Sequence, residues 1–281
     1  MAASDDQPST PEGGDRAPAP SRRRRARVRG AAALGAAAAV VAGLVAWREP
    51  PPPPDGLVIL YGDSLSTEAA GAFTDELART TEAEVVARLL PGASPCDAAG
   101  TMREDLALEA DVVVIQYVGN TTSPCMREGG ARPTGRALGE RIVADVEAAA
   151  TMFAEAGTRV VLVGGPHAPG LPAGDATLDI AEAYTRIVDE WPGELGRIRY
   201  ADAAATVTGP DRRFVERLPC RADEGPQQGC RGGQVVVRSA DGVHFCPAPP
   251  EGLRCPVPSP GARRFGTEMA RVVRMALDPG Y

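Results

Sequence analysis

The chain has 281 residues, a length that suits one catalytic domain with short appendages, and its formal net charge is −7. It contains no lysine, so all 30 basic residues are arginine, and this excludes Schiff-base chemistry, a pyridoxal-phosphate lysine and a Walker A loop. Residues 56–281 hold 22 arginines against 31 acidic residues. An acidic domain of this kind gives no support for nucleic-acid binding.

The N-terminal part of the chain carries the pattern of a membrane anchor. Six arginines between Arg22 and Arg29 directly precede the apolar stretch Gly30–Trp47, which is near the length needed to span a bilayer. Because arginines favour the cytoplasmic side, we expect a disordered cytoplasmic tail at 1–29 and a single-pass signal anchor in the cell membrane at 30–47. A cleaved secretory signal is the alternative, and a buried soluble helix fits the arginine flank poorly. Both of the first two interpretations export the chain after residue 48.

The folded domain is expected at 56–281, after a stiff proline-rich linker at 48–55. Continuous apolar runs predict five buried strands, at Leu57–Tyr61, Glu84–Leu90, Val112–Tyr117, Arg159–Val163 and Ile198–Ala201. Helices are expected between and after them, at Thr67–Arg79, Ala98–Glu109, Gly135–Glu155, Thr177–Glu190 and Pro260–Leu277. Residues 206–258 are rich in loops, with one further strand at Gln234–Arg238. Alternating strands and helices predict an α/β fold with a parallel sheet and helices on both faces, and a site beyond the carboxyl ends of the strands.

All six cysteines follow the apolar segment, and an even number in an exported domain indicates disulfides. No CxxC motif or Cys/His cluster suggests a metal site. Six cysteines allow 15 pairings. Proximity in the sequence or in the expected fold favours Cys96–Cys125, Cys220–Cys230 and Cys246–Cys255.

Candidate catalytic residues follow the first and second strands. Ser64, in Gly62-Asp63-Ser64-Leu65, lies at a strand-to-helix turn, where a serine can expose its hydroxyl and offer its backbone N–H to an oxyanion. Ser64 could instead simply cap the helix. Gly92, beyond the second strand, lets the backbone approach a substrate closely, although Pro91-Gly92 could equally be an ordinary turn.

Further candidates lie beyond the later strands. Asn120 is the only asparagine, and its amide could donate to an oxyanion; a turn residue and a glycosylation acceptor in Asn120-Thr121-Thr122 are the alternatives. In Asp241-Gly242-Val243-His244, the spacing lets the carboxylate meet the imidazole Nδ1–H and fix its tautomer. His167, the other histidine, lacks an aspartate at matching spacing and is a candidate substrate contact or a turn residue.

The order of four blocks resembles that of the SGNH hydrolases, or GDSL-type esterases: Gly62-Asp63-Ser64-Leu65, Gly92, Gly119-Asn120 and Asp241-x-x-His244. Together with the N-terminal segment, the chain resembles a membrane-anchored member of this family, of actinobacterial type. The third block of the family usually reads Gly-x-Asn-Asp, and Gly119-Asn120-Thr121-Thr122 departs from it. The resemblance covers residues 56–277 and implies a flavodoxin-like three-layer α/β/α sandwich.

The resemblance also implies a mechanism of acyl transfer. His244, oriented by Asp241, would take the proton of Ser64 as Ser64 attacks an ester, and the N–H groups of Ser64 and Gly92 with the Asn120 amide would hold the oxyanion. No metal or organic cofactor would be required, and the substrate would be a small-molecule or glycan ester.

Three other functions compete with this one. An α/β-hydrolase needs Gly-x-Ser-x-Gly, and Ser66 stands where the second glycine belongs. An O-acyltransferase acting on cell-envelope polysaccharide would use the same residues as an esterase. A non-catalytic carbohydrate-binding module on this fold is disfavoured by the intact set of four blocks.

Overall fold

The computed structural model describes residues 56–127, 130–194, 196–246 and 259–278. The predicted tail at 1–29, apolar segment at 30–47 and linker at 48–55 lie outside these residues. Among the helices that are described, none combines the length and apolar character needed to cross a membrane.

The core of the domain is a five-stranded sheet in the order β2-β1-β3-β4-β5, and every neighbouring pair of strands is parallel. The strands are β1 (Leu57–Gly62), β2 (Glu84–Leu89), β3 (Val112–Gln116), β4 (Arg159–Val163) and β5 (Ile198–Ala201). The predicted parallel sheet is therefore confirmed, with strand boundaries within one residue of those expected.

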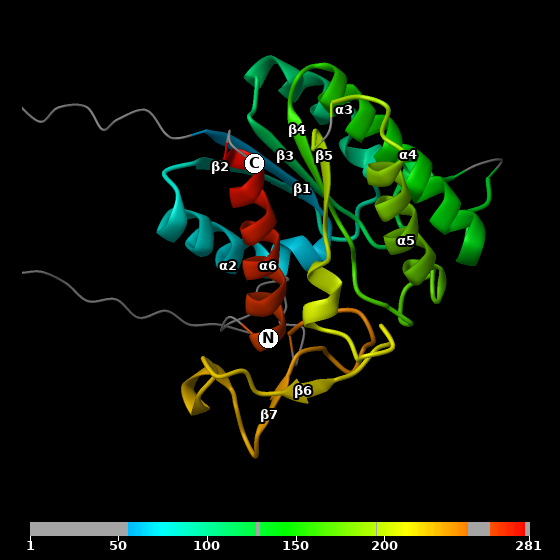
Figure 1. The fold of residues 1–281 in the computed structure, drawn as a ribbon. Coiled ribbons are helices and arrows are strands. Elements are labelled where there is room, and N and C mark those ends of the chain that lie inside the picture. The colour runs from blue at the N-terminus through cyan, green and yellow to red at the C-terminus, as the bar shows by residue number, and fades with distance from the viewer. Residues whose placement is uncertain (1–55, 128–129, 195, 247–258, 279–281) are drawn as a thin grey trace, which may run out of the picture. The chain divides into compact units, whose positions relative to one another are not determined.

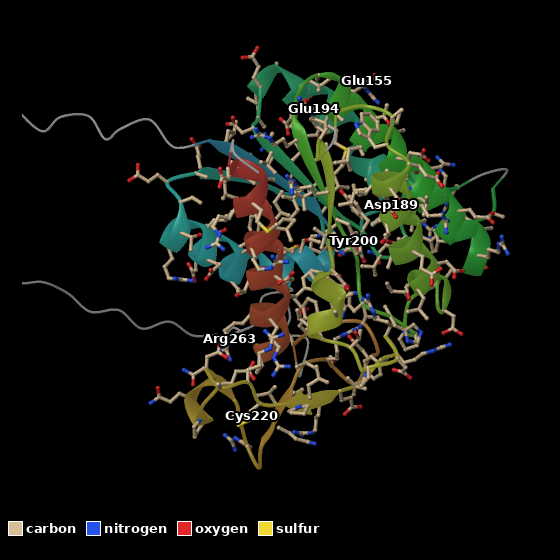
Figure 2. All side chains as sticks on the ribbon, viewed as in Figure 1. Glu155, Asp189, Glu194, Tyr200, Cys220 and Arg263 are labelled. Carbon is tan, nitrogen blue, oxygen red and sulfur yellow. A yellow bond between two sulfur atoms is a disulfide. The ribbon has the colours of Figure 1, made fainter. Side chains whose placement is uncertain are left out.

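Helices cover both faces of this sheet (Figure 1). One face packs against α2 (Ser64–Thr80) and α6 (Pro260–Leu277), and the other against α3 (Pro95–Asp105), α4 (Gly135–Glu155) and α5 (Ala176–Asp189). This is the three-layer α/β/α arrangement that the sequence predicts. Charged side chains such as Glu155 and Asp189, the last residues of α4 and α5, are exposed (Figure 2).

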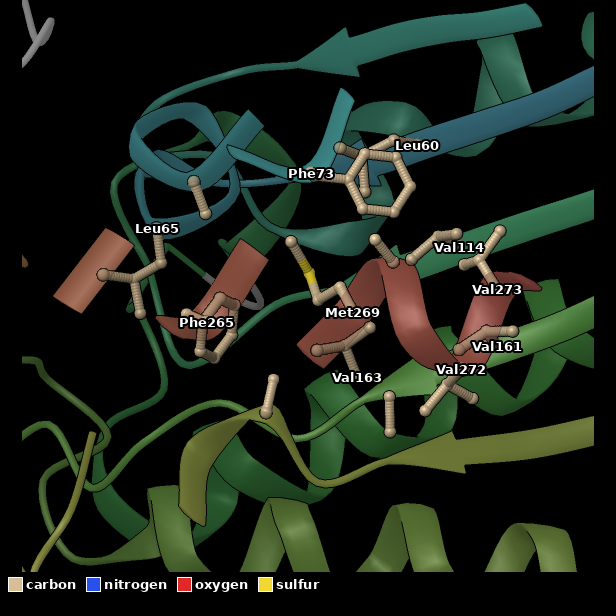
Figure 3. Close-up of a cluster of buried hydrophobic side chains, with 14 of the residues drawn as sticks. Leu60, Leu65, Phe73, Val114, Val161, Val163, Phe265, Met269, Val272 and Val273 are labelled. Carbon is tan, nitrogen blue, oxygen red and sulfur yellow. The ribbon is translucent and has the colours of Figure 1, made fainter. Parts of the chain in front are cut away.

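Alternating strand residues divide the core into two layers, because successive side chains of a strand point to opposite faces. In β1, Leu60 packs with α2 and α6, whereas Ile59 packs with the helices of the other face. Figure 3 shows the first layer, in which Leu60 and Val114 lie near Met269 of α6. All of these side chains are fully buried, which explains why the strands read as unbroken apolar runs.

Two predicted helices begin earlier than expected. The helix predicted at Thr67–Arg79 begins at Ser64, because the Asp63 side chain caps it by accepting the Leu65 N–H at 3.0 Å. The helix predicted at Ala98–Glu109 begins at Pro95, since proline fits the first turn of a helix. It ends at Asp105 and passes into a 3₁₀ turn, η1 (Leu106–Leu108).

The segment between β5 and α6 holds a small antiparallel pair, β6 (Arg217–Pro219) and β7 (Gln234–Val236). The predicted strand at Gln234–Arg238 corresponds to β7 but ends at Val236, and β6 was not predicted. Three further short 3₁₀ turns complete the described elements: η2 (Pro124–Met126), η3 (Ala203–Thr206) and η4 (Pro226–Gln228).

Two of the predicted disulfides are present. Cys96 pairs with Cys125, and Cys220 pairs with Cys230. Cys220 lies in the segment that follows β6 (Figure 2). The third predicted pair, Cys246–Cys255, includes Cys255, which lies outside the described residues.

Candidate active site

Ser64 lies at the point where β1 gives way to α2. It is the first residue of the helix and only 6% exposed, and the cap is the preceding Asp63 rather than Ser64 itself. The hydroxyl of Ser64 is therefore not used to cap the helix and is available for another partner.

That partner is His244, which the chain brings to Ser64 from the loop between β7 and α6. The His244 Nε2 lies 3.0 Å from the Ser64 Oγ, and the His244 Nδ1 lies 2.7 Å from the Asp241 Oδ2. With Nδ1–H donating to the carboxylate, Nε2 carries a lone pair that can accept the serine hydroxyl. The structure thus joins Ser64, His244 and Asp241 in one hydrogen-bonded series.

The Asp241 carboxylate also organises its own loop. Its Oδ1 accepts the backbone N–H groups of Val243 at 2.8 Å and His244 at 2.9 Å. Partial burial works to raise the pKa of Asp241, but the hydrogen bonds from the His244 side chain and from these two N–H groups outweigh it and hold the pKa below the usual value. Asp241 therefore favours its ionised form, which can stabilise an imidazolium at His244.

The loops after β2 and β3 bring the remaining predicted residues towards Ser64, because β2 and β3 flank β1 in the sheet. Gly92 has a φ of +78°, which favours glycine, and its carbonyl accepts the Thr122 hydroxyl at 2.7 Å. The Ser94 hydroxyl donates to the Asn120 carbonyl at 2.6 Å. Polar contacts therefore tie the Gly92 loop to the Asn120 loop on both sides.

Two of the predicted oxyanion donors are free to bind a ligand. Among the hydrogen bonds made by the described part of the chain, none uses the backbone N–H of Ser64 or of Gly92. The Asn120 amide donates to the Asp63 Oδ2 at 3.4 Å. An amide nitrogen has two hydrogens, so this contact leaves Asn120 a second N–H.

Asp63 holds the centre of this arrangement. Its side chain is 1% exposed and accepts N–H groups from Leu65, Val118 and Asn120. Burial raises the pKa of Asp63 to about 6, although the backbone donors and the nearby His244 work to lower it. One carboxylate thus links the serine turn to the end of β3.

Arg238 binds the loop that carries His244, Asp241–Cys246 (the histidine loop), from the inside of the domain. Its side chain is 0% exposed and lies over the rings of Phe214 and Phe245. Its guanidinium donates to the carbonyls of His167, Gly242 and Val243 at 3.1, 3.2 and 2.8 Å. Burial lowers the pKa of Arg238 to about 10. A buried cation thus fixes the carbonyls immediately before His244.

Glu68 holds the same loop from the side of α2. Its Oε2 accepts the backbone N–H groups of Phe245 at 2.7 Å and Cys246 at 3.2 Å. Burial raises the pKa of Glu68, against the lowering effect of the Phe245 N–H and of His244. The peptide groups on both sides of His244 are therefore bound by charged side chains.

His167 lacks an aspartate at the three-residue spacing of Asp241 and His244, but the fold gives it an aspartate partner from farther along the chain. Its Nδ1 accepts the Phe214 N–H at 3.1 Å, so its Nε2 carries the proton that is shared with Asp175 at 2.8 Å, eight residues along the chain. The His167 side chain is 6% exposed. Both ring nitrogens bind within the protein, and a contact of His167 with substrate stays a prediction.

Ser66, two residues after Ser64, has a structural partner. Its hydroxyl donates to the Gln116 Oε1 at 2.6 Å, and its N–H donates to the same oxygen at 3.1 Å. Gly62 leaves the room for this contact, since a Cβ there would lie 2.4 Å from the Ser66 Cβ.

In the part of the chain that the structure describes, no group of three or more His, Cys, Asp or Glu residues is arranged to hold a metal ion.

Comparison with known proteins gives no match to a family model and none to a curated protein. Solved structures do match. A protein from Bacteroides fragilis that is described as an acylhydrolase aligns with a TM-score of 0.50 and 17% identity, over 89% of this chain and 100% of that one. The chain has the fold of that acylhydrolase.

Two further structures align less closely. A GDSL-like lipase from Bacteroides thetaiotaomicron has a TM-score of 0.49 and 16% identity, over 87% of this chain and 98% of its own. A catalytic mutant of an acetylxylan esterase from Geobacillus stearothermophilus has a TM-score of 0.48 and 11% identity, over 79% of this chain and 94% of its own.

Sequence reasoning missed Asp63, Glu68 and Arg238 as parts of the site. A signal existed for Asp63, because an aspartate just before a helix is a common cap. Glu68 and Arg238 gave no such signal, since charged residues are usually exposed. Their importance lies in contacts with backbone groups that are remote in the sequence or buried by the fold.

Proposed function

We propose that this chain is a serine esterase of the SGNH, or GDSL, type, which hydrolyses carboxylic esters of small molecules or glycans. The observation that carries the proposal is the series Ser64 Oγ–His244 Nε2–Asp241 at 3.0 and 2.7 Å. Nucleophile, base and orienting carboxylate are the three roles that acyl transfer to a serine requires. A fold shared with an acylhydrolase supports the proposal by analogy.

In the first step, His244 accepts the proton of Ser64 as the Ser64 oxygen attacks the ester carbonyl. The negative charge that develops on the carbonyl oxygen is met by the N–H groups of Ser64 and Gly92 and by the second N–H of Asn120. Each donor of this kind contributes about 3 kcal/mol to transition-state stabilisation. His244 then gives its proton to the departing alcohol, and an acyl-serine remains.

In the second step, water gives a proton to His244 and attacks the acyl-serine. The Ser64 oxygen then leaves, takes that proton back from His244 and releases the acid, which restores the free serine and the neutral imidazole. The side chains of His244 and Asp241 are 21% and 34% exposed, so water can reach the base. An O-acyltransferase would differ in this step alone, by admitting a sugar hydroxyl in place of water.

We further propose that residues 56–281 act outside the cytoplasm, anchored by 30–47, with 1–29 in the cytoplasm and 48–55 as a spacer; secretion after cleavage is the alternative. Support comes from the arginines that flank the apolar segment. The two disulfides also support it, because disulfides persist in oxidising compartments.

Ser64→Ala tests the catalytic proposal. The variant should remain folded and lose turnover of model esters by a factor on the order of 10⁴ to 10⁶, because no other nucleophile can replace Ser64. A fluorophosphonate probe should label the wild-type chain at Ser64 and should not label the variant.

Ser66→Ala is the matched control, and it should still be labelled because the Ser66 hydroxyl is engaged by Gln116. A folded Ser64→Ala protein that retains near-normal turnover would falsify the assignment. A wild-type chain that the probe does not label would favour a binding module.

A further inference from the structure

The position of His244 relative to Ser64 depends on what holds the histidine loop to α2. The loop Asp241–Cys246 is an irregular segment, and in the described part of the chain its backbone is hydrogen-bonded to α2 only through the side chain of Glu68. The Phe245 N–H and the Cys246 N–H, immediately after His244, both donate to the Glu68 Oε2, at 2.7 and 3.2 Å.

Glu68 lies on the helix that begins with Ser64. Residues four positions apart lie on the same face of a helix, so the Glu68 carboxylate and Ser64 face the same side of α2. The contact from Glu68 to Phe245 spans 177 positions in the sequence, and the contact from Ser64 to His244 spans 180. The two contacts are thus one helical turn apart and run between the same two segments.

We propose that Glu68 is a positioning residue for His244, which sets the distance between the base and the nucleophile by binding the backbone after His244 to the nucleophile's own helix. This inference rests on the proposed esterase function. Among the described residues, the Glu68 carboxylate is hydrogen-bonded to neither the Ser64 hydroxyl nor the imidazole. Glu68 acts through the two N–H groups that it accepts.

Arg238 supports the same loop from the other direction, by donating to the carbonyls of Gly242 and Val243. Those contacts lie within the segment that leads from β7 into the loop, because Arg238 is only four and five positions away from its partners. They fix the shape of the loop. The contact from Glu68 is the one that fixes the loop against α2.

The geometry separates a positioning role from an electrostatic one. Both N–H groups bind the same carboxylate oxygen, so the amide oxygen of a glutamine could accept both without a negative charge. An aspartate would keep the charge, but its carboxylate would be withdrawn by one carbon–carbon bond, about 1.5 Å. If reach matters, Glu68→Gln should be active and Glu68→Asp impaired. If charge near the imidazole matters, the order should be the reverse.

The experiment compares Glu68→Gln, Glu68→Asp and Glu68→Ala in the full chain, with turnover of a model ester and the rate of fluorophosphonate labelling as readouts. We expect Glu68→Asp and Glu68→Ala to lower kcat and the labelling rate by about 10- to 100-fold, as misplacement of about 1 Å does. KM should change by less than about twofold, and Glu68→Gln should stay within about threefold of wild type.

Glu76→Ala and Glu76→Gln are the matched controls, because Glu76 is another glutamate of α2 and pairs with Arg79 at the far end of the helix. They should leave kcat and labelling unchanged. Melting temperatures of all variants identify any that fail to fold, and the comparison of Glu68→Gln with Glu68→Asp decides even if Glu68→Ala does not fold.

The inference is overturned if Glu68→Asp matches wild type, or if Glu68→Gln is as slow as Glu68→Asp. Ser64→Ala, measured alongside, separates this failure from a failure of the proposed function. If Ser64→Ala is unlabelled and the Glu68 variants are all normal, the esterase proposal stands and only the role of Glu68 falls. If the wild-type chain is not labelled at all, both fall.

Discussion

At the scale of single residues, the serine turn depends on the buried carboxylate of Asp63. This side chain caps α2 and accepts the Val118 N–H and the Asn120 amide. A buried carboxylate with a raised pKa is a cost to folding at neutral pH, where it must be ionised. The Asp63 carboxylate therefore serves to orient the serine turn and the Asn120 amide, rather than to stabilise the fold.

The pKa of Asp63 predicts how stability should vary with pH. The pKa is about 6 in the folded chain against a usual 3.8, so the folded state binds the proton more tightly. The contribution of Asp63 to stability is thus fully present below pH 3.8 and is lost as the pH rises through 6, by roughly 3 kcal/mol.

Asp63→Asn removes this titration. The unfolding free energy of wild type minus that of Asp63→Asn should fall as the pH rises from 4 to 7, as measured by urea denaturation. Asp75→Asn, at an exposed position of the same helix, corrects for the loss of one carboxylate. A difference that stays flat or grows with pH would contradict the raised pKa.

At the scale of elements, α2 is held in place by α6, and the two helices approach closely at Gly266. A Cβ at Gly266 would lie 2.6 Å from the Ala69 carbonyl oxygen and 2.9 Å from the Phe73 nitrogen. Both atoms belong to the backbone of α2 and cannot move aside cheaply. Since α2 carries Ser64, this contact bears on the site as well as on the core.

Gly266→Ala should therefore lower the unfolding free energy by about 1–3 kcal/mol through overpacking. Gly71→Ala is the matched control, because Gly71 lies within α2 and a Cβ there meets nothing within 4 Å. The control should raise stability by about 0.5–1 kcal/mol, since alanine favours a helix over glycine. Urea denaturation measures both, and equal effects would contradict the close packing.

Cys96, in the first turn of α3, is joined by a disulfide to Cys125 in η2. These two elements directly follow the loops that carry Gly92 and Asn120. A bridge there limits the freedom of two oxyanion donors before a substrate arrives. The closed loop has a sequence separation of 29, for which a stabilisation of about 2–4 kcal/mol is typical.

Replacing both cysteines of this pair by serine should depress kcat by about tenfold or more at temperatures where the protein remains folded. The double replacement Cys220→Ser with Cys230→Ser should mainly lower the melting temperature, because that disulfide lies beside β6 and β7. Unchanged turnover in the Cys96→Ser, Cys125→Ser protein would show that the bridge serves stability alone.

At the scale of the whole molecule, the order of the strands brings the site together. β1 lies between β2 and β3. The segments that carry Ser64, Gly92 and Asn120 therefore leave the sheet side by side, at the carboxyl ends of these strands. His244 reaches these strand ends from the segment before α6, and α6 itself packs beside α2.

The location of the molecule can be tested with the full chain in a bacterial host. Protease added to intact spheroplasts should digest residues 56–281 and leave the tail at 1–29 protected, because the arginine flank keeps the N-terminus inside. Release of the domain into the medium would support a cleaved signal. A catalytic domain that resists the protease until the cells are lysed would refute export.

Sequence patterns alone predict the parallel sheet, the five main helices and the candidate residues Ser64, Asp241 and His244. These features are local: an apolar run marks a buried strand, and a motif carries its chemistry at fixed spacing. The Cys96–Cys125 and Cys220–Cys230 pairs followed from proximity in the sequence or in the expected fold, and the structure confirms both.

No sequence pattern predicts the contacts of Asp63 beyond its helix cap, those of Glu68 and Arg238, or the pairing of His167 with Asp175, all of which arise in the folded chain. Each role depends on which backbone group or side chain lies opposite once the chain has folded. Glu68, for example, looks like any exposed helical glutamate until the loop after His244 packs against it, 177 positions away. Burial depends on how the whole chain packs. The effects that the charge and length of these side chains have on the site therefore arise only after folding.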